Sequence, residues 1–110
     1  MHQFIITLFL LLGWHALADF PLQGQYLSEA KNRNTTTGRY VWKWALFMHG
    51  LIHGLGVYLI TGSFPLALVE VIVHIRVDYL KCENALTFNQ DQSVHVFFKV
   101  IYALAMVMAL

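Results

Sequence analysis

The sequence has 110 residues, of which 58% are hydrophobic and only 12% are charged, a composition typical of a small membrane protein with one domain. The net charge of +1 is too small to favour nucleic acid, which we exclude as a partner. The single cysteine, Cys82, excludes an internal disulfide and a thiolate metal site. Any metal would therefore have to be held by histidines and carboxylates.

The N-terminal segment predicts a first transmembrane helix over about residues 3–19. Residues 1–18 contain no Asp, Glu, Lys or Arg and would span about 27 Å as a helix, close to the thickness of a hydrocarbon core. A cleaved signal peptide is the alternative, because Ala16-Leu17-Ala18 resembles a cleavage site, but the leader lacks the basic residues of such peptides. We therefore expect a retained helix that ends before Pro21.

Residues 20–41 form a long polar segment, which we expect to be a loop between membrane helices. Directly after it, Tyr40, Trp42 and Trp44 surround Lys43, a pattern typical of the aromatic belt at a membrane interface. The second helix is therefore expected to enter the bilayer at this point.

A helical hairpin is predicted next. No Asp, Glu, Lys or Arg occurs from Trp44 to Val69, a stretch longer than one span, and residues 61–65 supply a turn within it. Gly50 and Gly54 lie one helical turn apart, which allows a neighbouring helix to pack closely. The two expected helices cover about residues 42–60 and 65–81.

A last helix is predicted over about residues 92–110, with Asp91 as a candidate N-terminal cap. Lys99 is its only later charge, and Glu70 of the preceding helix is its expected partner at a similar depth. The sequence thus predicts an all-α integral membrane bundle of four transmembrane helices, forming one domain over residues 1–110 in contact with the lipid bilayer.

The orientation of the bundle follows from the basic residues, because cytoplasmic connections are enriched in Lys and Arg. Only the first and third connections carry them, so the loop at about 20–41 is expected in the cytoplasm and both termini on the non-cytoplasmic side. The basic residues concerned are Lys31, Arg33, Arg39, Lys43, Arg76 and Lys81.

Ionisable residues recur at a spacing of four, which places both members of each pair on one helix face. In the predicted topology three of the pairs meet at the cytoplasmic level. The histidine-only pair is expected roughly 8 to 14 Å deeper than Trp44, where it would form the floor of the cluster. The pairs are His15 with Asp19, His49 with His53, His74 with Asp78, and Asp91 with His95.

Such a cluster of imidazoles and carboxylates on adjacent helical turns is typical of a divalent metal site. Zinc is the first expectation, and a mixed His and carboxylate shell also suits Mn or Fe. Asp19 and Asp91 are the candidate catalytic carboxylates, either of which could act as general base on a metal-bound water. The expected ligands are His15, His49, His53, His74, Asp78 and His95.

These segments resemble a known family of small bacterial and phage membrane proteins, domain of unknown function 3307. The resemblance rests on four pieces that occur in the family's order: His15 to Gln23, His49 to His53, His74 to Lys81, and Asp91 to His95. It implies an inner-membrane, multi-pass protein of bacterial type. The pattern is also similar to that of inner-membrane proteins described as metal-dependent hydrolases, an analogy at the level of hypothesis.

The leading hypothesis is a metal-dependent hydrolase with a site near the cytoplasmic face, acting on a lipid or membrane-proximal substrate. The first alternative is a non-enzymatic membrane protein, such as a holin or an accessory factor. The second is a bundle that binds b-type haem through two histidines. A second copy of the chain or another membrane protein is the expected class of protein partner.

Overall fold

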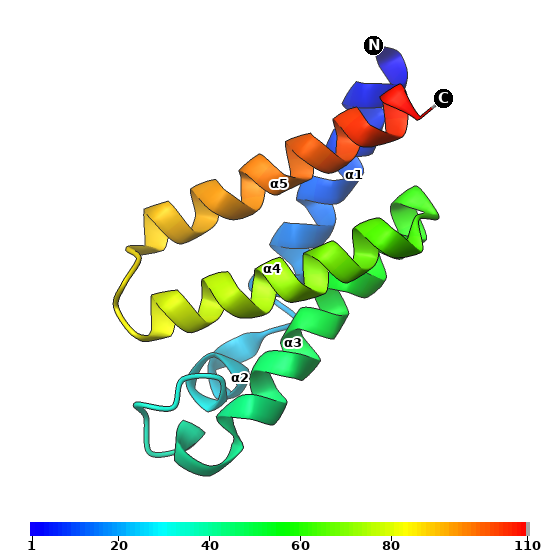
Figure 1. Cartoon of the computed structure of the whole chain (residues 1–110). Helices are drawn as coiled ribbons and strands as arrows, with labels where there is room; N and C mark the ends of the chain where they lie inside the picture. The colour runs from blue at the N-terminus through cyan, green and yellow to red at the C-terminus, as the bar shows by residue number, and fades with distance from the viewer. Residues whose placement is uncertain (110) are drawn as a thin grey trace.

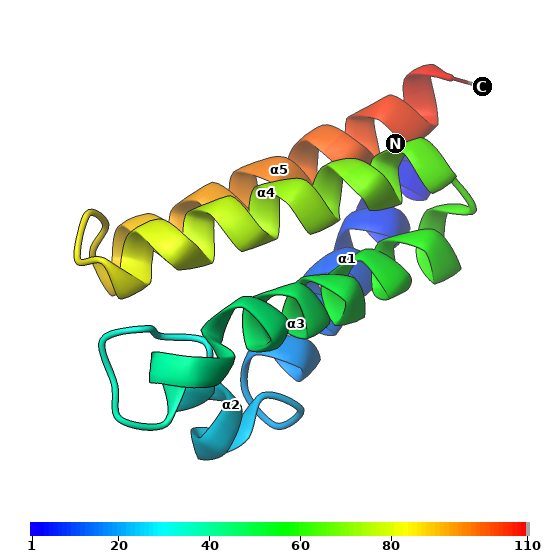
Figure 2. The same ribbon diagram turned by 60° about the horizontal axis from the view of Figure 1, so that its bottom comes forward.

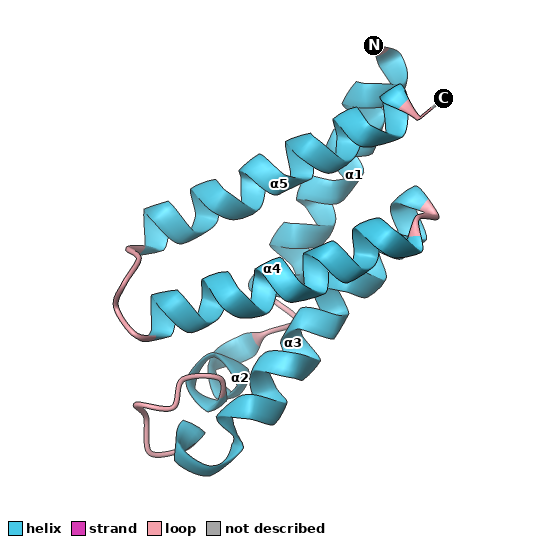
Figure 3. Cartoon of the chain, in the orientation of Figure 1, coloured by secondary structure: helices cyan, strands magenta, loops and turns pink. Residues whose placement is uncertain are grey.

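The computed structural model describes residues 1–109, and this part of the chain contains helices and no strands (Figure 3). The observation confirms the predicted all-α class. The helices are α1 (His2–Asp19), α2 (Gly24–Ala30), α3 (Gly38–Thr61), α4 (Phe64–Cys82) and α5 (Phe88–Met108).

The four long helices form an elongated bundle with extents of 47 × 23 × 22 Å. α1 packs against α3 and α5, and α4 packs against the same two helices, so the helices follow one another around the bundle in the order α1, α3, α4, α5. Both chain ends and the α3–α4 turn lie at one end, called here the termini end (Figures 1 and 2). α2 and the α4–α5 loop lie at the other end, called the α2 end.

The α3–α4 turn is built by local sequence. Gly62 ends α3 in the left-handed region with φ of 69°, a conformation that glycine adopts without steric cost. The Ser63 side chain then accepts a hydrogen bond from the Leu66 backbone N–H at 3.3 Å, and Pro65 occupies the first turn of α4. The two helices are therefore joined as a tight antiparallel pair.

Close packing of α3 on α4 depends on the predicted glycines. A Cβ atom at Gly50 would lie 2.8 Å from Cγ1 of Ile75, and one at Gly54 would overlap the Val71 side chain. Neither position has room for a side chain, so the two helix backbones can approach closely only because both residues are glycine. This approach brings the histidines of α3 against those of α4.

α5 begins at Phe88, earlier than the expected position of about 92. Thr87 is its N-cap, and a capping box joins the Thr87 and Gln90 side chains to each other's backbone N–H groups. The expectation that Asp91 caps the helix was wrong, because Asp91 lies within the first turn and is buried in the bundle. The expected end at Leu110 lies outside the described residues.

The segment expected to be a loop contains the short helix α2, and α3 begins at Gly38 and not at about 42. Arg33 lies after α2 and donates two hydrogen bonds to the Glu83 carboxylate, at 2.9 and 2.6 Å. This contact raises the pKa of the Arg33 guanidinium and lowers that of the Glu83 carboxyl. The α2–α3 loop is thus tied to the end of α4.

The distribution of side chains is inverted relative to a water-soluble protein. The buried apolar cluster of Leu11, Val57, Tyr102 and Ala103 is small, whereas large apolar side chains such as Phe9 lie exposed on the outside. Of the helices within residues 1–109, α1, α3 and α5 are long and apolar enough to cross a membrane. Their outer faces are suited to contact with a lipid bilayer.

Candidate metal centre

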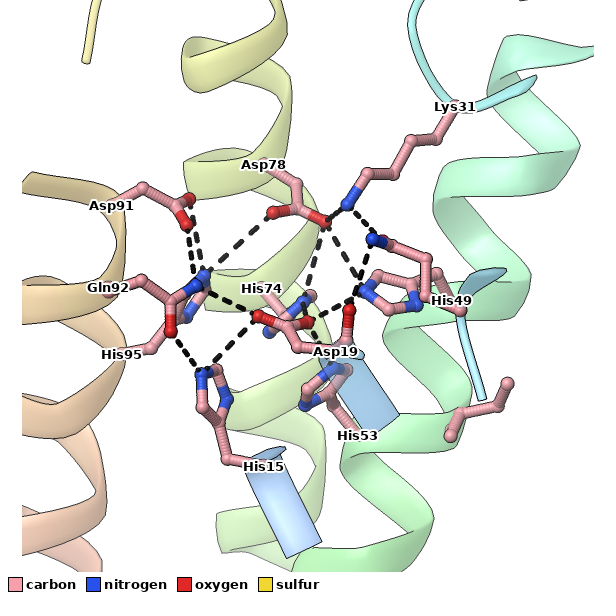
Figure 4. Close-up of polar contacts among 12 residues, drawn as sticks. His15, Asp19, Lys31, His49, His53, His74, Asp78, Asp91, Gln92 and His95 are labelled. Atoms are coloured by element: carbon pink, nitrogen blue, oxygen red, sulfur yellow. Dashed lines mark hydrogen bonds and ion pairs between the residues drawn. The ribbon is translucent and has the colours of Figure 1, made fainter. Parts of the chain in front are cut away.

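The bundle brings together all eight His and Asp residues singled out in the sequence (Figure 4). They come from four different helices, and each is at most 8% exposed. The cluster lies one helical turn from the apolar core. His15 stands four residues after Leu11 on α1, and His53 stands four residues before Val57 on α3. The eight residues are His15, Asp19, His49, His53, His74, Asp78, Asp91 and His95.

The densest part of the cluster surrounds one oxygen of Asp19. Asp19 Oδ1 lies 3.0 Å from Nε2 of His49, 2.9 Å from Nε2 of His53 and 3.6 Å from Nε2 of His74. These four residues each offer one ligand atom, and the atoms lie within 4.8 Å of one another. Three helices therefore direct potential ligands toward a common point.

The second oxygen of Asp19, Oδ2, contacts Gln92 of α5 and His15 of α1. Gln92 donates from Nε2 to Asp19 Oδ2 at 3.0 Å, and its Oε1 lies 3.0 Å from His15 Nε2. His15 Nε2 is also 3.3 Å from Asp19 Oδ2. Gln92 thus fixes both residues of the α1 pair, although sequence reasoning gave it no role. Its position, three residues before His95 on the same helix, is the one signal that could have indicated it.

A second group of three ligand-type residues lies nearer the α2 end. Asp78, Asp91 and His95 also offer ligand atoms within 4.8 Å of one another. His95 Nε2 is 3.4 Å from Asp91 Oδ1 and 3.9 Å from Asp78 Oδ1. The other oxygen of Asp78 is 3.4 Å from Nε2 of His74, so this group adjoins the first.

Lys31 is a member of the cluster that sequence reasoning missed. It directly follows α2, is only 4% exposed, and donates to Asp78 Oδ2 at 2.8 Å and to the Gln23 side chain. A lysine in a polar segment is usually solvated, and no periodicity distinguishes this one. Only the packing of α2 against α3 places its side chain in the bundle.

The ion pair predicted between Glu70 and Lys99 is confirmed. Lys99 Nζ donates to Glu70 Oε2 at 2.7 Å, and the Tyr102 hydroxyl donates to Glu70 Oε1 at 2.9 Å. Glu70 Oε2 also lies 3.4 Å from Nδ1 of His74. The pair therefore borders the cluster on the side of the termini.

The positions of the histidines along the bundle axis differ from the expectation that His49 and His53 lie together below the other pairs. Figure 4 shows Asp78 and Asp91 toward the α2 end and His15 beside His53 toward the termini end. His49 shares Asp19 Oδ1 with His53 and approaches Asp78 Oδ2 at 3.6 Å. His49 therefore bridges the two levels, and His15 joins His53 in the floor. The step of four residues along α1 places His15 one turn nearer the termini than Asp19, which accounts for the position of His15.

Polar atoms inside the cluster are left without hydrogen-bond partners. Among the described residues, eight buried side-chain atoms lack one, and all belong to the five clustered histidines and Asp91. The imidazoles are also crowded, with ring centroids of His53 and His74 only 3.6 Å apart. Buried polar atoms of native proteins are normally paired, so this number in one place indicates an interaction still to be made.

The charge balance of the cluster also favours a bound cation. Glu70 and Lys99 compensate each other, which leaves the carboxylates of Asp19, Asp78 and Asp91 against the single ammonium group of Lys31. Two negative charges therefore remain when the histidines are neutral. A divalent cation would balance them, and the donor set of imidazoles and carboxylates suits such an ion.

Comparison with known proteins gives a family but no activity. No curated protein and no solved structure matches the chain. A family model described as "Protein of unknown function (DUF3307)" matches residues 6–110, nearly the whole sequence, and this is the family that the four sequence pieces indicated. The chain therefore belongs to the DUF3307 family.

Proposed function

We propose that the protein holds a divalent metal ion inside a membrane-embedded helical bundle, with Asp19, His49, His53 and His74 as ligands. The observation that carries the proposal is the convergence of three Nε2 atoms on Asp19 Oδ1, at 2.9 to 3.6 Å. Ligands bound tetrahedrally at about 2.0 to 2.1 Å lie roughly 3.3 Å apart, within this range. An ion would also supply the missing charge.

Neighbouring polar groups would orient these ligands. Gln92 holds Asp19 through its second oxygen, and Glu70 lies beside the far nitrogen of His74. Hydrogen-bonding partners of this kind fix the orientation of metal-bound histidines and carboxylates. Zinc is the preferred ion because three of the four proposed ligands are histidine nitrogens. The same ligands would also suit Mn or Fe.

A metal-dependent hydrolase is the activity that this centre supports best. A divalent ion lowers the pKa of a bound water and so supplies a nucleophile at neutral pH. Asp91 is the candidate general base, because its Oδ1 is buried and has no hydrogen-bond partner. Asp19, the other candidate base, is better assigned to the ligands. The apolar surroundings favour a lipid or membrane-proximal substrate.

We also propose that α4 crosses the bilayer together with α1, α3 and α5. Its composition is too charged for a span by itself, but Glu70 and Asp78 face the interior and are each paired with a lysine. α4 is joined to α3 by a tight turn and packs against it more extensively than any other pair of helices. A helix packed in this way enters the membrane with its partner.

The four spans would place both termini outside the cytoplasm and the α2 end inside, in the inner membrane of a bacterium. The basic residues support this orientation, since Arg33, Arg39 and Lys43 are exposed near α2. Labelling with a membrane-impermeant thiol reagent tests it. Cys82 should react only after the membrane is opened, whereas Ala109→Cys in a Cys82→Ser background should react in intact cells. The reverse pattern would contradict the orientation.

Metal analysis of the detergent-purified protein tests the centre. We expect stoichiometric divalent metal in the wild type, a large loss in His74→Ala and no change in the control His2→Ala, because His2 is exposed at the start of α1. A folded wild type without metal would overturn the proposal. A Soret band would favour haem instead, and cell lysis on expression that persists in His74→Ala would favour a holin-like role.

A further inference from the structure

We propose that the cluster binds two divalent ions, with Asp78 as the carboxylate that bridges them. The inference rests on the proposed metal function and extends it by a second site. Asp78 Oδ2 faces the first group, at 3.4 Å from His74 Nε2 and 3.6 Å from His49 Nε2. Asp78 Oδ1 faces away from it, at 3.9 Å from His95 Nε2. One carboxylate thus offers an oxygen to each side.

The second ion would be held by Asp78 Oδ1, Asp91 and His95, so that Asp91 is a ligand when two ions are bound and a free general base only in the form with one ion. His95 is fully buried, yet neither of its ring nitrogens has a hydrogen-bond partner. Asp91 is 1% exposed, and its Oδ1 is also unpartnered while it lies 3.4 Å from His95 Nε2. His95 also offers a ligand atom within 4.8 Å of Glu70 and His74, but Glu70 is already paired with Lys99, which leaves Asp78 and Asp91 as the carboxylates available to an ion beside His95.

The two sites are close enough to act together. The His74 and His95 rings, one from each site, are stacked with centroids 4.2 Å apart and planes inclined by 22°. Paired metal ions that share a bridging ligand lie about 3.5 to 4 Å apart. Gln92 supports the same pairing, since its Nε2 donates both to Asp19 Oδ2 and to Asp91 Oδ2, at 3.0 and 3.1 Å.

Lys31 sets the order of binding. One divalent ion balances the two negative charges of the cluster, so a second ion adds charge that must be removed elsewhere. The Lys31 ammonium group lies 2.8 Å from Asp78 Oδ2, the oxygen that faces the first group, so Asp78 can bridge two ions only after this positive charge has moved away. The second ion is therefore expected to bind more weakly than the first and to displace Lys31 from Asp78.

Metal stoichiometry tests the inference. At saturating Zn²⁺ or Mn²⁺ we expect two ions per chain in the wild type and in the control His2→Ala, but one in His95→Ala and in Asp91→Asn. One ion in the wild type, unchanged in His95→Ala, would overturn the second site and leave the proposed function intact. No ion in the wild type would overturn both.

Electron paramagnetic resonance of the Mn²⁺-loaded wild type gives a test that needs no variant. One equivalent should produce an isolated Mn²⁺ signal, and a second equivalent should convert it to that of a spin-coupled pair. Two independent signals would contradict a shared bridge.

Lys31→Met should tighten binding of the second ion by roughly tenfold or more, because a like charge is removed. Unchanged affinity would overturn the role given to Lys31.

Discussion

Two buried polar regions lie side by side in the bundle and differ in how completely they are paired. Around Glu70, both carboxylate oxygens accept a hydrogen bond, one from Lys99 and one from Tyr102, and the charges cancel. In the adjoining His and Asp cluster, eight buried atoms have no hydrogen-bond partner, and three carboxylates share the single ammonium group of Lys31. The first region is paired by residues of the chain itself, whereas the second is the region in which we propose a bound ion.

This difference separates a structural role from a binding role at equal burial. Burial alone would assign both regions to the same class, since Glu70, Lys99, His74 and His95 are all at most 1% exposed. Ionisable side chains inside a bilayer are tolerated when they face the interior of the bundle and pair with each other, as Glu70 and Lys99 do. An open cluster is costly unless something completes it, and such a cost is typical of functional sites.

Breaking the closed pair should have the largest effect on stability. Lys99→Met leaves the Glu70 carboxylate buried without its cation, a change that costs about 3–5 kcal/mol in buried pairs. The double variant Glu70→Gln/Lys99→Met should recover much of that loss, because no buried charge is left alone. Thermal unfolding in detergent measures both. A double variant no more stable than Lys99→Met would show that the pair is not a closed unit.

Removing the proposed metal ion should have the next largest effect, and only on the open cluster. A ligand present at one hundred times its dissociation constant stabilises the folded state by about 2.7 kcal/mol. A chelator should therefore lower the unfolding temperature of the wild type but not that of His53→Ala, which has already lost a ligand. Equal responses of the two proteins would assign the chelator effect to something other than this site.

Replacing Gln92, which makes hydrogen bonds to three residues of the cluster, should weaken metal binding without unfolding the protein. Gln92→Met removes the contacts to His15, Asp19 and Asp91 while keeping a side chain of similar length. Loss of such an orienting residue typically lowers metal affinity 10–100-fold. Competition with a chelator of known affinity measures the change, with exposed Ser93→Ala as the neighbouring control. Equal affinities in the two variants would exclude an orienting role for Gln92.

The smallest effect is expected outside the membrane, at the Arg33–Glu83 contact. The pKa of Glu83 is lowered, so its contribution to stability is present above its ordinary value and is lost as the pH falls through the lower folded value. Glu83→Gln should therefore be slightly less stable than the wild type at neutral pH and equal to it in acid. A difference that grows in acid would contradict the sign.

Local signals in the sequence account for much of the fold. Hydropathy predicted the four long helices, and the turn at Gly62 separated α3 from α4 as expected. The start of α5 was also encoded locally, by the capping box of Thr87 and Gln90, although the charged Asp91 was the more conspicuous candidate. α2 gave no comparable signal, because seven residues in a polar segment have too few turns for a clear periodicity.

The sequence by itself determined which side chains share a helix face, because the period of the α-helix relates positions four apart. It therefore identified the His and Asp pairs of the cluster, and the similar depth of Glu70 and Lys99 on consecutive helices indicated their pairing. Only the tertiary structure decided that Asp78 faces two groups, that Lys31 reaches it, and that His49 lies beside Asp19. Those contacts depend on helix tilt, rotation and loop path, which arise from packing between segments distant in the chain.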